Sequence, residues 1–187
     1  MIDKNGNKIY KNDGAEYIDT EDGFLFKKQN ERCQLIAYFG GEATVTLPEN
    51  INGNSYEIYQ MRGVRNVIIP NGMTSIGSQA FAWGDSLTSI EIRSGVTSIG
   101  DRAFYGCRSL MNIIILSRDV EIYDSSYTIP TTATIYGYAG STAQAFAEKY
   151  GRTFVALLEE SGPSSSQIIL EANQVRARET VTLTISL

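Results

Sequence analysis

Histidine is absent from this chain of 187 residues, and cysteine, proline and tryptophan are scarce, with two Cys, four Pro and one Trp. Without His the chain lacks the commonest general base, the usual partner of a Ser or Cys nucleophile and the commonest metal ligand. Paired carboxylates such as Glu159-Glu160 remain, but they lie in polar, loop-like stretches typical of a solvated surface. We therefore expect no enzyme activity, no metal site and no cofactor.

Long apolar runs and basic stripes are also missing. No stretch of about 18 apolar residues predicts a membrane-spanning helix. The formal net charge is −5, and neither repeat lines up a dense row of Lys or Arg, which argues against nucleic acid or an anionic membrane as partner. The polar opening, residues 1–8, carries no hydrophobic signal region. Either the protein is cytoplasmic or the chain begins inside a longer precursor, and we favour the second.

The strongest pattern in the chain is a repeat with a period of 23 residues. Residues 66–87 read NVIIPNGMTSIGSQAFAWGDSL, and residues 89–110 read SIEIRSGVTSIGDRAFYGCRSL. A third, degraded unit places four more residues on the same apolar rows: Ile113, Ile115, Ile122 and Tyr127. A shortened unit precedes Val64. Such a period predicts a solenoid, because no single unit can bury its apolar side alone and neighbours must stack.

Each unit predicts two strand-like edges and one helical or irregular edge. Residues 90–93 alternate apolar and polar, as a strand with one buried face does, and residues 96–99 form a second short extended piece. Gly100 is predicted to take a positive φ at the corner between edges. Asp101, like Ser78 in the preceding unit, can cap a short helical turn.

The register of the repeat predicts which side chains are neighbours. It stacks Ile76 on Ile99 and Phe81 beside Phe104. It also places Cys107 inward, about three coils or roughly 15 Å from the region of Cys33. A disulfide needs Cα atoms within about 7 Å, so we predict two buried free thiols.

The sequences at both ends of the repeat region are typical of caps that shield the apolar ends of a solenoid. Ser141 and Gln144 have the spacing of a capping box, and Gly151 is a C-terminal stop, so the sequence predicts a helix of about ten residues. Its apolar stripe consists of Ala143, Phe146, Ala147 and Tyr150. Residues 153–157 read as a strand that completes this cap, and residues 24–26 and 33–39 read as a hairpin that covers the first coil.

The pattern I-x-I-P-x-x-V-T-S-I-G-x-x-A-F-x-G-C-x-S-L resembles the BspA-like leucine-rich repeats of bacterial surface proteins, over about residues 23–157. The resemblance implies a β-rich right-handed solenoid with short parallel strands, an N-terminal hairpin cap and a C-terminal helix-strand cap. Residues 82–84 depart from the pattern, since they read AWG where the next copy has YGC. The expected segments are an N-terminal extension (1–22), the N-terminal cap with a shortened first repeat (23–63), leucine-rich repeats (64–133), the C-terminal cap (134–160), a linker (161–166) and the truncated start of a following β module (167–187).

The last segment ends in clean alternation of apolar and hydroxyl residues, with Val181, Leu183, Ile185 and Leu187 on one side. It loosely resembles the opening of a cohesin or another Ig-like module, and a closing strand of the same domain is the third interpretation. The stretch before it, residues 161–166, has the Gly, Pro and Ser composition of a flexible linker.

The resemblance implies an exported protein, secreted or held at the cell surface, that is a non-catalytic interaction module and monomeric within a longer chain. It would bind a protein or polysaccharide through a solenoid face. The candidate ligand face is Trp83 and Tyr105 near the helical edge, with Glu91, Arg93 and Arg118 near the strand edge. A packing role for the aromatic residues stays open. The alternative function is a structural or targeting module of a multi-modular, cellulosome-type enzyme or scaffold.

Overall fold

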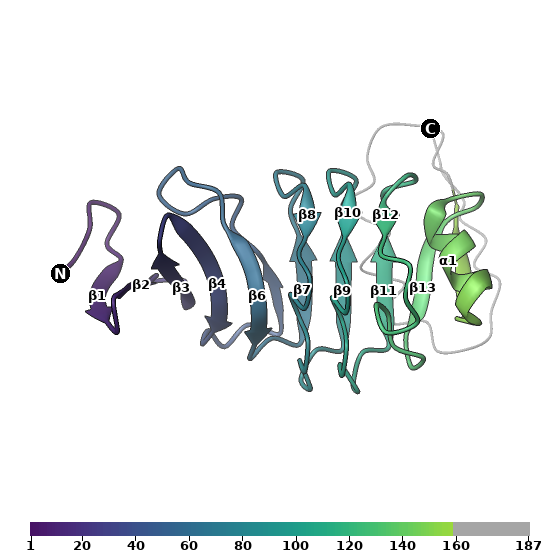
Figure 1. The fold of residues 1–187 in the computed structure, drawn as a ribbon, viewed down its shortest axis with the longest axis horizontal. Helices are drawn as coiled ribbons and strands as arrows, with labels where there is room; N and C mark the ends of the chain where they lie inside the picture. Colours follow the sequence, from purple (N-terminus) through teal and green to yellow (C-terminus); the bar gives the residue numbers. More distant parts are fainter. Residues whose placement is uncertain (159–187) are drawn as a thin grey trace, which may run out of the picture. The chain divides into compact units, whose positions relative to one another are not determined.

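The repeats stack as a parallel β-solenoid in the computed structural model, which describes residues 1–158 (Figure 1). One side of the coils forms a six-stranded sheet in the order β14-β13-β11-β9-β7-β5. Its strands are β5 (Thr44–Thr46), β7 (Asn66–Ile69), β9 (Ser89–Ile92), β11 (Asn112–Ile115), β13 (Thr134–Tyr138) and β14 (Phe154–Leu157). A second, three-stranded sheet contains β8 (Ser75–Ile76), β10 (Ser98–Ile99) and β12 (Glu121–Ile122). The predicted solenoid is confirmed.

The core consists of rows in which equivalent side chains of successive coils lie on one another. Val67 pairs with Ile90, and Ile90 pairs with Ile113, so the predicted period sets the register of the large sheet. Ile76 pairs with Ile99 in the small sheet, as predicted. All five side chains are at most 1% exposed. Since burying such a side chain contributes about 1.5–3 kcal/mol, these rows hold the coils together.

The third edge of each coil is a series of turns and contains no helix. Residues in the left-handed region interrupt it, including Gln79 (φ 58), Trp83 (φ 61) and Arg102 (φ 52). A right-handed helix cannot continue through such residues, so the irregular alternative is the observed one. We call this the turn edge. Its inward side chains still stack as expected, because the rings of Phe81 and Phe104 lie nearly parallel with centroids 5.6 Å apart.

Gly100 lies at the predicted corner, but the reason predicted for it is wrong. It is not among the glycines with positive φ. A Cβ on Gly100 would instead lie 2.6 Å from the backbone nitrogen of Ser78 in the preceding coil. The glycine is required by the close approach of two backbones.

Tyr127 does not join the apolar row that the 23-residue period assigns to it. The backbone N–H of Phe104 donates to the carbonyl of Thr128, so Ile129 takes the place beneath Phe104. Ile129 is fully buried, whereas Tyr127 is 57% exposed. The third unit has two extra residues before this point, and they shift Tyr127 outward.

A third, five-stranded sheet covers the start of the solenoid, in the order β1-β2-β3-β4-β6. Its strands are β1 (Lys8–Asn12), β2 (Ala15–Asp19), β3 (Phe24–Gln29), β4 (Arg32–Tyr38) and β6 (Glu57–Arg62). The predicted hairpin is present as β3 and β4, closed by Asn30 and Glu31, both with positive φ. The segment 1–22, expected as an N-terminal extension, adds the further hairpin β1–β2 with Asp13 and Gly14 at its turn.

The other end of the solenoid is closed by α1 (Thr142–Tyr150) and β14. The Ser141 side chain accepts from the N–H of Gln144, and Gly151 ends the helix in the left-handed region, as predicted. The Gln144 side chain accepts from the N–H of Gly140, one residue before the expected partner. Phe146 and Ala147 are buried on the predicted stripe. The helix therefore covers the apolar edge of the last coil.

An ion pair and a hydrogen bond fasten α1 to the loop after β12. Lys149 Nζ donates to Asp124 Oδ1 at 2.5 Å, and the Tyr150 hydroxyl donates to the same oxygen at 2.7 Å. The hydrogen bond from Lys149, followed by the one from Tyr150, holds the pKa of the Asp124 carboxyl below its ordinary value of 3.8.

We expect Asp124→Asn to lower the melting temperature slightly at pH 7. Because the folded state lowers the pKa of Asp124, the carboxylate contributes stability above pH 3.8 and loses it as pH falls through the lower folded value. The difference between wild type and variant should therefore be constant from pH 7 to 5 and vanish in more acidic solution. Thermal unfolding followed by circular dichroism across pH measures it. A difference that grows on acidification would contradict the assignment.

Cys33 and Cys107 are both buried and free, as predicted. The expected linker at residues 161–166 and the β module at residues 167–187 lie outside the described residues. Among residues 1–158, no helix is long and apolar enough to cross a membrane.

Candidate ligand-binding face

Three aromatic side chains from successive coils meet on the turn edge: Trp83, Tyr105 and Tyr127. We call these three residues the aromatic row. The ring centroids of Trp83 and Tyr105 are 5.0 Å apart and those of Tyr105 and Tyr127 are 5.7 Å apart, each pair at an interplanar angle of 80°. Trp83 is 44% exposed and Tyr127 57%. The rings thus fix one another by edge-to-face contacts. Trp83 and Tyr127 keep much of their surface exposed to solvent, whereas Tyr105 between them is partly buried.

The sequence pattern indicated Trp83 and Tyr105 but not Tyr127. These three residues are spaced by 22, not by the period of 23 that governs the core rows. A search for exposed aromatic residues at a spacing one shorter than the core period would have found Tyr127. The guanidinium of Arg102 lies 6.0 Å from the centre of the Tyr127 ring and flanks the row.

The predicted residues of the strand edge are less available than expected. Glu91 faces away from the core, in register with Ile68 and Ile114, but only 8% of the residue is exposed. Its Oε1 accepts from Arg93 Nε at 3.3 Å. Glu91, predicted as an outward residue of the candidate ligand face, thus offers little accessible surface, and its carboxylate is paired with Arg93. Arg93 itself keeps 41% of its side chain exposed.

Arg118 lies in the loop between β11 and β12 and contacts the next coil. Its guanidinium carbon is 4.6 Å from the centre of the Tyr138 ring, within the range of a cation–π interaction. Its Nη1 donates to the carbonyl of Ala139 at 3.2 Å. Arg118 thus stacks on β13. The five predicted residues lie on two different edges of the coils.

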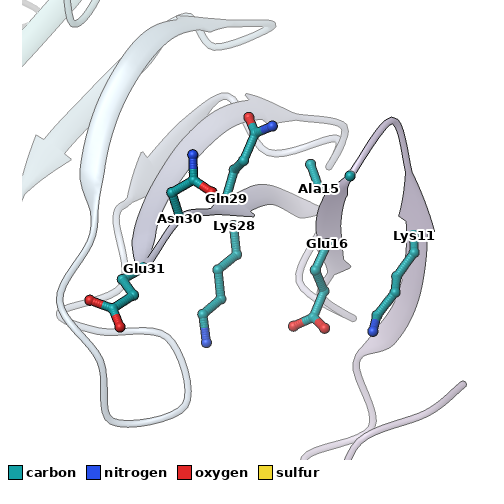
Figure 2. A pocket seen from close by; sticks show the side chains of 8 residues that line it. Lys11, Ala15, Glu16, Lys28, Gln29, Asn30 and Glu31 are labelled. Atoms are coloured by element: carbon teal, nitrogen blue, oxygen red, sulfur yellow. The ribbon is translucent and has the colours of Figure 1, made fainter.

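A shallow hollow of about 300 Å³ lies between the turns of the hairpins β1–β2 and β3–β4. Figure 2 shows Lys11, Glu16 and Lys28 extending from three strands in the same direction, with Glu31 from the turn beside them. Strand register explains this arrangement, since Lys11 faces Glu16 and Glu16 faces Lys28. Mixed charges on long, mobile side chains form an open polar surface and not an enclosed pocket for a metabolite.

The buried thiols are packing groups and not nucleophiles. Burial raises the pKa of the Cys107 thiol to about 11. Its Sγ donates to the carbonyl of Phe81 at 2.9 Å, so the proton stays on sulfur at neutral pH. Burial also raises the pKa of Cys33. Within residues 1–158, no cluster of three or more His, Cys, Asp or Glu could hold a metal ion.

Comparison with known proteins finds two solved structures of similar chains, both bacterial, and no curated protein matches. A leucine rich cell surface protein from Faecalibacterium prausnitzii is 19% identical over 70% of this chain and 45% of its own, with a TM-score of 0.30. A leucine-rich repeat protein from Bacteroides capillosus is 20% identical over 69% of this chain and 71% of its own, with a TM-score of 0.28. This chain thus spans less than half of the first protein.

The family assignment comes from the repeats themselves. The family model for the BspA type leucine rich repeat region matches residues 43–136 in six copies, just over half of the chain. These residues extend from just before β5 into β13, and therefore include the stacked coils described above. The chain belongs to the BspA-type leucine-rich repeat family.

Proposed function

We propose that this chain is a non-catalytic interaction module, secreted or displayed on a bacterial surface, that binds a protein or glycan through one face of its solenoid. The observation that carries the proposal is the aromatic row on the turn edge. Trp83 and Tyr127 expose large ring surfaces there without filling the core. Exposed aromatic rings with polar surroundings are typical of recognition surfaces.

The geometry favours the turn edge over the strand edge. Edge-to-face contacts hold the rings in place, so little side-chain entropy would be lost on binding. On the strand edge, Arg93 is paired with Glu91 and Arg118 is stacked on Tyr138. Those charges already interact within the chain, and a ligand would have to displace them.

The resemblance of the repeats to those of bacterial surface proteins supports the location, and the family model assigns residues 43–136 to this repeat type. The solenoid geometry supports a macromolecular ligand. Equivalent residues lie on successive coils about 4.8 Å apart and form broad ladders. Small metabolites prefer concave sites, whereas the aromatic row is an exposed edge.

Binding to purified extracellular-matrix proteins, plant cell-wall glycans and bacterial surface extracts, measured by biolayer interferometry, tests this function. We expect any ligand of the wild type to lose about tenfold or more in affinity on Trp83→Ala or Tyr105→Ala, because these rings form the contact. Arg93→Glu is the matched control on the strand edge and should leave binding unchanged. Loss of binding on Arg93→Glu alone would move the site to the strand edge. The non-catalytic assignment would be overturned if the chain hydrolysed a ligand and if replacing a single carboxylate abolished that hydrolysis.

A further inference from the structure

Trp83 occupies a backbone position that glycine occupies in the neighbouring coils. The N–H of Phe81 donates to Ala103 O, which makes Trp83 (φ 61) the equivalent of Gly106 (φ 73). In the preceding coil, the N–H of Met61 donates to Ala80 O. Met61 is therefore the equivalent of Phe81, and Gly63 (φ 85) is the equivalent of Trp83. Residues with a Cβ are disfavoured in this left-handed region, and glycine is not. One coil therefore carries a strained tryptophan where its neighbours carry an unstrained glycine.

The strain at Trp83 is not explained by core packing. The side chain leaves the core and is 44% exposed. Its six-membered ring rests on Gly106, where a Cβ would come within 2.6 Å of Cε3. The glycine of the next coil thus makes room for the ring on the surface. A strained residue that does not fill the core is a ground for a functional hypothesis, and at Trp83 the exposed ring supplies a second ground that the other residues with positive φ on the turn edge, Gln79 and Arg102, lack.

The aromatic row runs along the direction in which the coils stack. Trp83, Tyr105 and Tyr127 come from three successive coils, and their centroid spacings of 5.0 and 5.7 Å are close to the spacing of about 4.8 Å between parallel strands. A ligand lying along the row therefore meets one aromatic ring per coil. An extended polymer of repeating units fits this periodic arrangement, and a single small molecule does not.

The residues around the aromatic row indicate the chemistry of that polymer. The guanidinium of Arg102 lies 6.0 Å from the centre of the Tyr127 ring and pairs with Asp101. The exposed residues Asp85 and Arg108 follow Trp83 and Tyr105 closely in the chain, so carboxylate and guanidinium groups accompany the rings. A typical protein interface buries about 800 Å² per partner and has a desolvated core with few charged residues. The aromatic row differs, because charged side chains accompany its rings. Charges of both signs select neither a polyanion nor a polycation. Aromatic rings can pack against the C–H faces of sugar rings, and polar side chains can hydrogen-bond to sugar hydroxyls. This combination matches an uncharged carbohydrate.

We propose that the aromatic row binds an extended, uncharged polysaccharide of β-linked pyranose units, whose sugar rings stack on Trp83 and Tyr127 while the flanking polar groups bind its hydroxyls. β-Linked chains are straight enough to follow the row, whereas α-linked chains coil away from it. This inference rests on the proposed function and names its ligand class.

The test uses the full chain, mixed-linkage β-glucan, xylan and galactomannan as probes, and amylose and hyaluronan as contrasting glycans. Affinity electrophoresis and isothermal titration calorimetry measure binding, and thermal unfolding measures stability. The key variant is Trp83→Gly, because the neighbouring coils show that glycine suits this backbone. Tyr123→Ala is the control, since Tyr123 is 51% exposed, close to the 57% of Tyr127, and lies outside the row.

We expect the wild type to bind at least one β-linked probe, and Trp83→Gly to weaken that binding about tenfold or more while the melting temperature stays equal or rises. Tyr127→Ala should weaken it too, and Tyr123→Ala should not. A purely structural tryptophan would give the opposite split, with a lower melting temperature and unchanged binding, and that result would overturn the inference. So would binding of amylose or hyaluronan without any β-linked neutral glycan.

Failure of the inference is distinguishable from failure of the proposed function. If no glycan binds but a matrix protein does, and Trp83→Ala abolishes that binding, the ligand class is wrong and the interaction module stands. If a glycan binds and only Arg93→Glu weakens it, the aromatic row is wrong and the module again stands. If the wild type binds no protein and no glycan in either panel, both proposals are overturned.

Discussion

Replacing Phe104 with Ala is expected to lower the free energy of unfolding by about 3 to 5 kcal/mol, the usual cost of removing a buried phenyl ring from a packed core. Phe104 is fully buried and stacks on Phe81 with centroids 5.6 Å apart. Ile129 lies on its other side in the next coil. Coils on both sides are hydrogen-bonded in fixed register, so they cannot move together to fill the space.

Urea unfolding followed by circular dichroism measures this loss, and Phe104→Leu should give an intermediate value because more of the volume remains. Tyr123→Ala provides the matched control, since its ring is exposed and its removal should change the free energy of unfolding by less than about 0.5 kcal/mol. If Phe104→Ala proved as mild as Tyr123→Ala, the row of Phe81, Phe104 and Ile129 would not be the structural core of the turn edge.

The core rows could be predicted because, in a solenoid, each sequence repeat folds into a coil with the same backbone path. Once the period of 23 was recognised, the neighbours of Ile76 and Phe81 followed by counting, and both are confirmed. Counting fails where the period changes. Two additional residues precede Ile129, so the rule that pairs Phe81 with Phe104 misplaces Tyr127. An insertion of this kind cannot be detected by comparing the units at a fixed offset.

Backbone conformation was harder to predict than side-chain rows. Gly100 looked like a residue selected for positive φ, yet its role is to let the backbone approach Ser78 of the preceding coil. Gln79, Trp83 and Arg102 take positive φ although none is glycine. Contacts between coils impose these conformations, and the backbone propensities of the individual residues do not predict them. For that reason the turn edge lacks the helix that a capping residue at position 101 suggested.

The hairpin β1–β2 was missed because its apolar content is low, but its turn carried a signal. Asp13 and Gly14 join the strands with φ of 49° and 74°, the conformation of a two-residue hairpin turn for which Asp-Gly is preferred. Tyr10 and Tyr17 face each other across the strands with stacked rings 5.3 Å apart. Such cross-strand aromatic pairs stabilise a hairpin that buries little else.

The candidate site was also only partly predictable from the sequence. Trp83 was recognisable as an outlier because it interrupts a repeated motif, and Tyr105 because it precedes Gly106 in that motif. The contact of Tyr105 with Tyr127 depends on the altered spacing of the third unit. The burial of Glu91 follows from neighbours on adjacent coils, which alternation along one strand does not reveal. Contacts between coils that follow the fixed period could be predicted from the sequence, whereas contacts that depart from it required the structure.

The C-terminal cap has a physical role distinct from that of any repeat. Each inner coil is covered on both sides by its neighbours, but β13 has only α1 and β14 beyond it. Ala143, Phe146 and Ala147 turn their side chains to this last coil. Without α1 the apolar end of the stack would face water, and without β14 the hydrogen-bonding groups at the outer edge of β13 would be free to pair with another chain.

Deleting residues 141–157 should therefore abolish cooperative unfolding or cause aggregation, a larger loss of stability than any single substitution in the core would cause. Size-exclusion chromatography with light scattering and thermal unfolding measure the two outcomes. Because a deletion also shortens the chain, Phe146→Asp tests the cap without that change and should lower stability by burying an unpaired charge against the last coil. Glu148→Ala is its control on the exposed side of the same helix and should have little effect. A deletion variant that remains monomeric and melts at the wild-type temperature would show that the coils close their own end and that α1 contributes nothing to their stability.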